Sequence, residues 1–457
     1  MTTAISALTR AAPEFPMEGD GCLEAVRPLP PGRVEVDLPR IERAVREILL
    51  AIGEDPDREG RCGPCAHPAG RAAQAERAAQ CDPVGTAAAS AGNRREPTMS
   101  MASLIATGTK VWLDGVAPGD VERVRAWGVS GATSNPTIVA QIIEKGSLDG
   151  RILQLIRDGC SDDQIAWSLD DDLVTRAQEA FLPVWERTEG DDGFVSFELD
   201  PLIDEPASGL SHAERVQQYI DLGTRWSAGL GNRMIKVPAT EAGIDALETL
   251  AAAGVTINVT LMFTQRQYRL ARDAIWRGAQ RRDSGLDGFK SVYSIFVSRV
   301  DAYTAANAPA LSRAAQGAVG LVNAKRTWRE NEDFWKDKRL RLRQEIVFAS
   351  TGVKNASDPP DKYARQLAGG GIETNPFATN DAVEASSRPY TREVDRMPPA
   401  HVLAEIDDKV NMMGLESHLM AEGIRKFADA QRRTLSLIGQ KRLHTLGTDY
   451  HPSSVEQ

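Results

Sequence analysis

The feature that most constrains the fold is a regular alternation of short apolar segments and longer helical segments after residue 110. The short segments are rich in β-branched and aromatic residues, which is typical of buried strands. They are residues 110–115, 131–136, 194–201, 232–239, 256–263, 292–300, 345–351 and 371–376. Segments with helical periodicity lie between them, among them 120–128, 162–188, 213–229, 242–254 and 264–280. Eight strand–helix units over about 300 residues predict a closed (β/α)8 barrel of the TIM type, in the α/β class.

An open, doubly wound parallel sheet is the alternative that the same alternation allows. It is less favoured, because no glycine-rich phosphate loop follows the first strand. In a closed barrel the active site would lie at the C-terminal ends of the strands.

Several predicted strands carry polar residues where packing alone would favour Val or Ile. Since side chains alternate between the two faces of a strand, Glu198 lies opposite Phe197 and Lys236 lies opposite Ile235 and Val237. If the apolar faces pack on the surrounding helices, the polar ones point into the barrel. These inward residues are Asp114, Glu198, Lys236, Asn258 and Thr260. Buried charges are costly, so the set is either a structural ion-pair network or an active site.

A lysine inside an apolar barrel suggests Schiff-base chemistry. Desolvation would leave some neutral amine to attack a ketone, and the protonated imine would then act as an electron sink for breaking a C–C bond. A nearby carboxylate or hydroxyl would have to move protons during imine formation.

Several motifs, in order and spacing, resemble the transaldolase family of class I aldolases. They are SGATSNPTI, VSFELDP, MIKVPATEAGIDALETLAAAGVTINVTLMFTQRQY, SIFVSRVDAY and FASTGVKN, and the match runs from about Lys110 to about Arg442. The resemblance implies an enzyme of the pentose phosphate pathway. It would transfer a dihydroxyacetone unit from sedoheptulose 7-phosphate to glyceraldehyde 3-phosphate, giving erythrose 4-phosphate and fructose 6-phosphate. No metal and no cofactor are implied.

The resemblance also implies roles for individual residues. Lys236 matches the Schiff-base lysine, Glu198 the carboxylate that acts through a bound water, and Thr260 the hydroxyl that holds that water. Asp114 matches the base that takes the C4 hydroxyl proton during cleavage. The matching substrate-binding residues are Asn135, Asn258, Ser294, Phe296 and, for the phosphate, Arg299, Ser350 and Lys354. The family often has Arg at the position of Lys354, and Arg299 could instead pair with Asp301 or a helix carboxylate.

Two other functions stay open at this point. A fructose 6-phosphate aldolase shares the barrel and the lysine, but that group typically carries Gln at the position of Glu198 and Tyr at that of Phe296. A catalytically idle barrel acting as a scaffold is the other alternative, and it leaves the retained polar set unexplained.

The N-terminal part of the chain has a different character. Residues 1–98 are predicted to be a largely disordered extension with one amphipathic helix at about 38–52, followed by the barrel at 99–445 and a tail at 446–457. Residues 34–60 resemble the opening helix of GTP cyclohydrolase I, but no catalytic domain of that type follows. A zinc site in residues 62–81, using Cys62, Cys65, His67 and Cys81, is the less favoured reading, because no second ligand pair or apolar core accompanies it.

The net charge of the chain limits the kinds of partner that it can bind. Lys and Arg total 54 against 64 Asp and Glu, a net charge of −10, which argues against a nucleic-acid or anionic-membrane surface. No apolar run approaches the ~20 residues of a membrane span, and no signal-peptide core is visible, so we expect a cytoplasmic protein. The expected partners are phosphorylated ketose and aldose sugars, with no nucleic acid and no membrane, and a homodimer is possible.

The charged stretch 325–345 is interpreted as a solvated helix face, and Asp200, Asp204 and Glu205 as an exposed loop.

Overall fold

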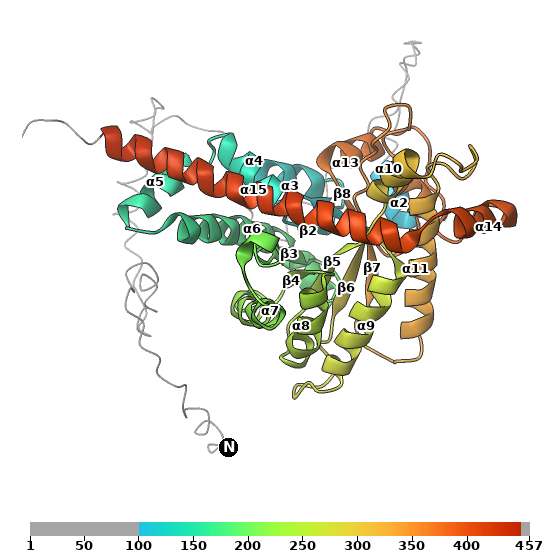
Figure 1. The fold of residues 1–457 in the computed structure, drawn as a ribbon, viewed down its shortest axis with the longest axis horizontal. Coiled ribbons are helices and arrows are strands. Elements are labelled where there is room, and N and C mark those ends of the chain that lie inside the picture. Colours follow the sequence, from blue (N-terminus) through green and yellow to red (C-terminus); the bar gives the residue numbers. More distant parts are fainter. Residues whose placement is uncertain (1–99, 449–457) are drawn as a thin grey trace, which may run out of the picture. The chain divides into compact units, whose positions relative to one another are not determined.

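The structure is a computed structural model that describes residues 100–448. Its centre is a closed barrel of parallel strands in the order β1 to β8, in which β1 pairs with β8 and places Lys110 opposite Ile372 (Figure 1). The strands are β1 (Lys110–Asp114), β2 (Gly131–Thr133), β3 (Val195–Glu198), β4 (Arg233–Pro238), β5 (Ile257–Met262), β6 (Ser291–Phe296), β7 (Glu345–Ala349) and β8 (Ile372–Asn375). The predicted (β/α)8 barrel is therefore confirmed, and the open sheet is excluded because the first and last strands pair.

Helices surround the barrel and extend from it. They are α2 (Ser100–Ala106), α3 (Pro118–Arg125), α4 (Pro136–Glu144), α5 (Asp149–Arg157), α6 (Asp162–Arg187), α7 (His212–Trp226), α8 (Glu241–Ala252), α9 (Gln265–Ala279), α10 (Ser298–Asn307), α11 (Val319–Trp335), α12 (Lys362–Leu367), α13 (Phe377–Glu384), α14 (Ala400–Lys409) and α15 (Met412–Thr448), with a short 3-10 turn at Pro206–Ser208. Helix α6 begins at a capping box, in which Ser161 Oγ accepts from the Gln164 backbone N–H and Gln164 Oε1 accepts from the Ser161 N–H.

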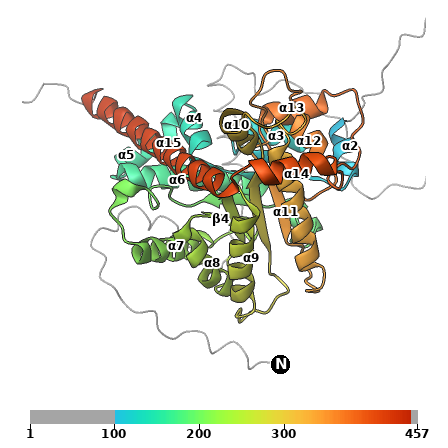
Figure 2. The ribbon, with the colours of Figure 1, turned by 45° about the vertical axis from the view of Figure 1, so that its right-hand side comes forward.

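The longest helix, α15, crosses the barrel. Figures 1 and 2 show it running from α14 past α4, α5 and α6, and it contacts these helices as well as α10 and β5. Ion pairs fasten its far half, including Arg433 to Glu144 at 2.5 Å and Arg442 to Asp162 at 2.8 Å. A helix held in this way forms part of the wall above the strand ends.

The barrel interior is layered. At the N-terminal end of the strands, Lys110 and Lys290 lie 2.7 and 2.6 Å from the carboxylate of the buried Glu345. Two residues further along, the inward side chains of β1, β4, β6, β7 and β8 form an apolar cluster with Phe194. Its strand members are Trp112, Met234, Val292, Val347 and Ile372. Two residues further again come Asp114, Lys236 and Ser294, which line one pocket, so the predicted inward orientation of Asp114 and Lys236 is confirmed.

The predicted alternation along β5 ends at a β-bulge. The register with β6 shifts between Val259 and Met262, and Leu261 has a left-handed backbone with φ of 53°. As a result Leu261 does not share the outward face of Val259. It packs in a cluster with Phe296 of β6 and Leu419 of α15. Bulges commonly redirect side chains next to active sites.

Two expectations about charged segments are wrong in part. Asp204 is buried rather than in an exposed loop, and its carboxylate accepts a hydrogen bond of 2.6 Å from the Tyr219 hydroxyl. In the stretch 325–345, Glu332 and Asp333 are exposed as expected, but Lys325 is buried. Its ammonium donates to the backbone carbonyls of Glu393 and Arg396, at 2.9 and 2.7 Å. Tertiary packing, not local charge density, decides which of these groups reach solvent.

The N-terminal predictions lie outside the described residues. This applies to the extension at 1–98, to its helix at 38–52 and to the cysteine-rich segment 62–81. At the other end, α15 continues to Thr448, a few residues past the predicted start of the tail.

Candidate active site

Lys236 and Glu198 form the centre of the site. They lie on neighbouring strands, β4 and β3, where they are directly paired in register. The Lys236 ammonium lies 3.0 Å from Glu198 Oε2 and 3.1 Å from the Ser134 carbonyl, and both side chains are less than a tenth exposed. Burial raises the pKa of Glu198, against the opposing effect of Lys236. A carboxylate with a raised pKa beside an amine is suited to take the proton from it.

Asp114 lies across the barrel mouth, at the end of β1. Its Oδ1 accepts hydrogen bonds from Asn135 Nδ2 at 3.1 Å and from Thr133 Oγ1 at 3.3 Å. Burial raises the pKa of Asp114, while Lys236, Asn135 and Thr133 oppose that rise. Asn135 is held in place because its Oδ1 also caps α4, accepting from the Ile138 N–H at 3.1 Å. The result is a fixed, desolvated carboxylate that can act as a base.

The next polar groups form a chain across β3, β5 and β6. Asn258 Nδ2 donates to Ser196 Oγ at 2.9 Å, and Ser294 Oγ donates to Asn258 Oδ1 at 2.7 Å. Thr260 Oγ1 is fully buried and has no hydrogen-bond partner among residues 100–448. A buried hydroxyl without a partner usually indicates an ordered water or a ligand.

The cationic side of the site comes from the ends of β6 and β7. Arg299, the second residue of α10, has a fully buried Nη1 without a hydrogen-bond partner among the described residues, and its guanidinium lies 5.4 Å from the Phe296 ring. Burial lowers the pKa of Lys354, and neighbouring Arg299 and Lys426 lower it further. Ser350, with a left-handed backbone of φ 54°, shares a 3.0 Å contact between its Oγ and that of Ser298. Crowded cations of this kind are relieved when an anion such as a phosphate binds.

One pocket collects most of these residues. It has about 1290 Å³ of empty space, counting its open mouth. All the sequence-predicted site residues line it except Glu198 and Asn258, which lie behind it in the hydrogen-bonded network. The alternative pairing of Arg299 with Asp301 does not occur, because the Asp301 carboxylate accepts from the Tyr363 hydroxyl and the Gly320 N–H.

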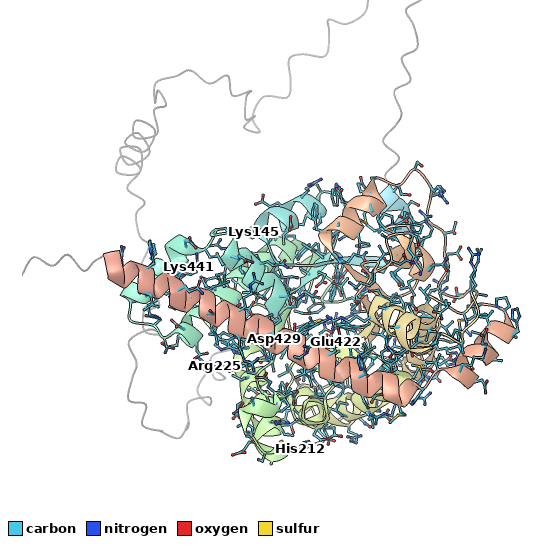
Figure 3. The ribbon with its side chains drawn as sticks, turned by 45° about the horizontal axis from the view of Figure 1, so that its top comes forward. Lys145, His212, Arg225, Glu422, Asp429 and Lys441 are labelled. Atoms are coloured by element: carbon cyan, nitrogen blue, oxygen red, sulfur yellow. The ribbon has the colours of Figure 1, made fainter. Side chains whose placement is uncertain are left out.

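Sequence reasoning missed the contribution of α15. Phe427 lines the pocket, and the charge of Lys426 lowers the pKa of Lys354. Glu422, which is ion-paired with Lys426, opposes the lowering of the Arg299 pKa by burial. Figure 3 shows Glu422 and Asp429 in order along this helix. No local pattern could have assigned these residues, because the helix reaches the site only through the tertiary fold.

Two broader findings concern the described part of the chain. No group of three or more His, Cys, Asp or Glu side chains in residues 100–448 is arranged to hold a metal ion. Within the same range, no helix combines the length and the apolar character that a membrane span needs.

Comparison with known proteins agrees with this geometry. The family model described as transaldolase/fructose-6-phosphate aldolase matches residues 111–438. A transaldolase of Thermobifida fusca is 31% identical over 360 residues, which cover 73% of this chain and 96% of that protein. A transaldolase of Mycobacterium tuberculosis is 34% identical over 308 residues, covering 62% of this chain and 80% of that protein. A transaldolase of Kocuria rhizophila is 30% identical over 359 residues, covering 72% of this chain and 95% of that protein. Because the matched region contains all but the first residue of the barrel, this chain belongs to the transaldolase/fructose-6-phosphate aldolase family and is an enzyme of the transaldolase type.

Proposed function

We propose that this enzyme transfers a dihydroxyacetone unit from sedoheptulose 7-phosphate to glyceraldehyde 3-phosphate through a Schiff base on Lys236. The observation that carries the proposal is the buried Lys236–Glu198 pair, with 3.0 Å between Nζ and Oε2, in a barrel whose mouth also holds Asp114. A catalytically idle scaffold would have no need for two desolvated acids, Glu198 and Asp114, around one lysine, because buried charges destabilise a fold unless they are paired.

Imine formation needs a neutral amine and a proton shuttle. Glu198 takes a proton from Lys236, and the amine attacks the C2 ketone to give a carbinolamine. Glu198 then returns a proton, through a water, to the departing hydroxyl, and the imine forms as that hydroxyl leaves as water. The unpartnered Thr260 Oγ1 is the group we propose to hold the shuttle water.

Cleavage and transfer need a base near C4. The Asp114 carboxylate takes the C4 hydroxyl proton, the C3–C4 bond breaks, and the electron pair moves into the imine to give an enamine. The first aldose then leaves, the enamine carbon attacks the acceptor aldehyde, and Asp114 returns the proton. Hydrolysis of the new imine releases the product. We propose that Asn135, Asn258 and Ser294 contact the sugar hydroxyls.

The phosphate is proposed to bind to Arg299, Ser350 and Lys354, with Phe296 forming the adjoining wall. The support is the unpartnered Arg299 Nη1 and the mutual repulsion of Arg299, Lys354 and Lys426, which an anion would relieve. Phosphorylated ketoses and aldoses are therefore the proposed partners.

A cytoplasmic location is proposed because such dianions do not cross a bilayer unaided. A homodimer is also proposed, and sedimentation velocity would test it.

We also propose that residues 99–445 are the catalytic unit and that residues 1–98 are dispensable for catalysis. The support is that the residues proposed for the site lie between Asp114 and Lys354 and that the family match begins at residue 111.

Borohydride trapping tests the proposal. The enzyme is incubated with fructose 6-phosphate, reduced and digested, and mass spectrometry should find a reduced three-carbon or six-carbon adduct on Lys236. Lys236→Ala should lose both the adduct and turnover while keeping its fold. Lys354→Ala is the matched control: it removes another lysine from the same pocket. It should still be trapped at Lys236, at a higher substrate concentration.

An adduct on another lysine, or none in the wild type, would overturn the assignment. Release of dihydroxyacetone without an acceptor, faster than transfer to glyceraldehyde 3-phosphate, would instead indicate an aldolase.

A further inference from the structure

A second cavity lies behind the Lys236–Glu198 pair. Lys236 lines the main pocket, whereas Glu198 lines this second cavity, and the two cavities share no lining residue. Its remaining walls come from α4, α6 and α15 and include Trp167, Asp170 and Thr434. We call it the rear chamber and define it by Glu198, Trp167, Asp170 and Thr434. It has room for about one water molecule.

Two buried oxygens of the rear chamber lack hydrogen-bond partners among residues 100–448. They are Asp170 Oδ1 and Thr434 Oγ1, and Thr434 is fully buried. Leaving such groups unpaired is costly, and polar cavities of this size typically hold an ordered water with two to four partners. A water in the rear chamber would have Asp170, Thr434 and Glu198 as its partners.

The charges around Asp170 favour proton sharing with Glu198. Burial, together with the neighbouring Glu198 and Asp171, raises the pKa of Asp170 to about 7, against the opposing effects of Arg233 and Lys236. Arg233 is already engaged, because its guanidinium lies 2.7 Å from the Asp171 carboxylate. Asp170 therefore forms no ion pair within residues 100–448, and a carboxyl group in that situation tends to share a proton with a neighbouring one.

Helix α15, which forms another wall of the chamber, contributes no unpaired charged side chain to it. From α15 the chamber residues are the uncharged Gln431 and Thr434. The charged residues between them on this helix, Arg432 and Arg433, are ion-paired with Glu205 and Glu144. The charges that face Glu198 from the main pocket are Lys236 and Arg299, which lower its pKa, and Asp114, which raises it.

We propose that Asp170 is a positioning residue for the transaldolase reaction, linked to Glu198 by a water that it holds together with Thr434. Glu198 must act alternately as acid and base while the imine forms and is hydrolysed. A proton passes from Glu198 to the chamber water and from that water to Asp170, and it returns by the same route, so the exchange is balanced. The chamber thus supplies protons from outside the main pocket, where the substrate binds. The inference rests on the proposed function, because it acts through the role of Glu198.

The test is the pH dependence of imine formation in a single turnover of the full chain with fructose 6-phosphate, quenched with borohydride. Asp170→Asn removes a negative charge beside Glu198, so Glu198 ionises more easily and the acidic limb of the profile should move to lower pH. Its maximal rate should fall roughly tenfold, less than the ~10²–10⁴-fold loss expected for an acid–base group itself. The matched control is Asp172→Asn, on the same helix but paired with Arg151 at 2.8 Å and about one-third exposed. It should change neither the rate nor the profile.

A second variant and a crystal structure cover the case in which Asp170→Asn does not fold. Thr434→Val should slow imine formation without moving the acidic limb, and Thr434→Ser should restore the rate. A high-resolution structure of the wild type should show a water within hydrogen-bond distance of Asp170 Oδ1 and Thr434 Oγ1. An unshifted profile for folded Asp170→Asn, the same shift in Asp172→Asn, full activity in Thr434→Val, or a dry chamber would overturn the inference. Failure of wild-type trapping at Lys236 would overturn the proposed function instead.

Discussion

Replacing Glu345 by Gln should strongly destabilise the barrel without changing its chemistry. The Glu345 carboxylate lies at the N-terminal end of the barrel, 2.7 Å from Lys110 Nζ and 2.6 Å from Lys290 Nζ. The Lys290 side chain is 1% exposed, so its charge has no access to water as compensation. In the variant the buried ammonium of Lys290 and the half-buried ammonium of Lys110 would face a neutral amide.

The expected loss of unfolding free energy depends on the contacts that the two lysines keep in the variant. Removing one partner of a buried ion pair typically costs ~3–5 kcal/mol. Asp191 still contacts both lysines, at 2.8 and 3.3 Å, so we expect a loss near the lower limit, about 3 kcal/mol at pH 7. The combined change Glu345→Leu with Lys290→Met should recover most of it, because apolar replacement of a whole buried pair is often neutral.

The effect should depend on pH with a definite sign. Burial acts to raise the pKa of Glu345, but Lys290 and Lys110 outweigh it and the pKa is lowered from the ordinary value of 4.5. The stabilisation is therefore complete above about pH 4.5 and is lost as the pH falls through the lower, folded-state value. The difference between the wild type and Glu345→Gln should shrink in acid.

Urea unfolding followed by circular dichroism, at pH 7 and at several acidic pH values, measures both quantities. Borohydride trapping at Lys236 serves as the check on function, since the apolar layer of Trp112, Met234 and Val292 separates the two sites. A loss below about 1 kcal/mol at pH 7, the range of an exposed pair, would refute the reasoning.

Two further predictions concern the acids and the chain's N-terminal part. Asp114→Ala should still form the imine but lose cleavage by ~10²–10⁴-fold, whereas Glu198→Gln should slow imine formation itself. In rapid-quench kinetics, an Asp114→Ala enzyme that forms no imine beside a Glu198→Gln enzyme that forms it normally would show the roles to be reversed. A chain beginning at Met99 keeps α2, whose Met101 and Leu104 are fully buried, and should retain the transfer rate of the full chain with no effect of added zinc. Loss of activity or of cooperative unfolding in that chain would show residues 1–98 to be part of the enzyme.

Much of the site could be predicted because it depends on strand periodicity. Asp114 and Lys236 lie on inward faces that a period of two assigns without any knowledge of the partners. The phosphate-binding residues were harder to predict, since Ser350 and Lys354 lie in a loop. No local pattern shows that Asp301 accepts a hydrogen bond from Tyr363 and does not pair with Arg299. Asp170 could not be recognised at all, because on α6 it is one of three consecutive aspartates.

The sequence by itself determined the eight strand–helix units and the face on which each strand carries its chemistry, whereas the pairing of the first and last strands, which closes the barrel, is a finding of the structure. The units and the faces follow from backbone geometry, which acts over a few residues and is recorded in the periodicity. Only the tertiary structure decided that the bulge at Leu261 breaks the alternation, that α15 brings Phe427 and Lys426 to the pocket, and that Asp170 and Thr434 share a chamber with Glu198. Thr434 and Asp170 are separated by most of the barrel in sequence. Their meeting depends on where a long helix packs, and a helical pattern shows which stripe of residues is apolar but not which surface that stripe will cover.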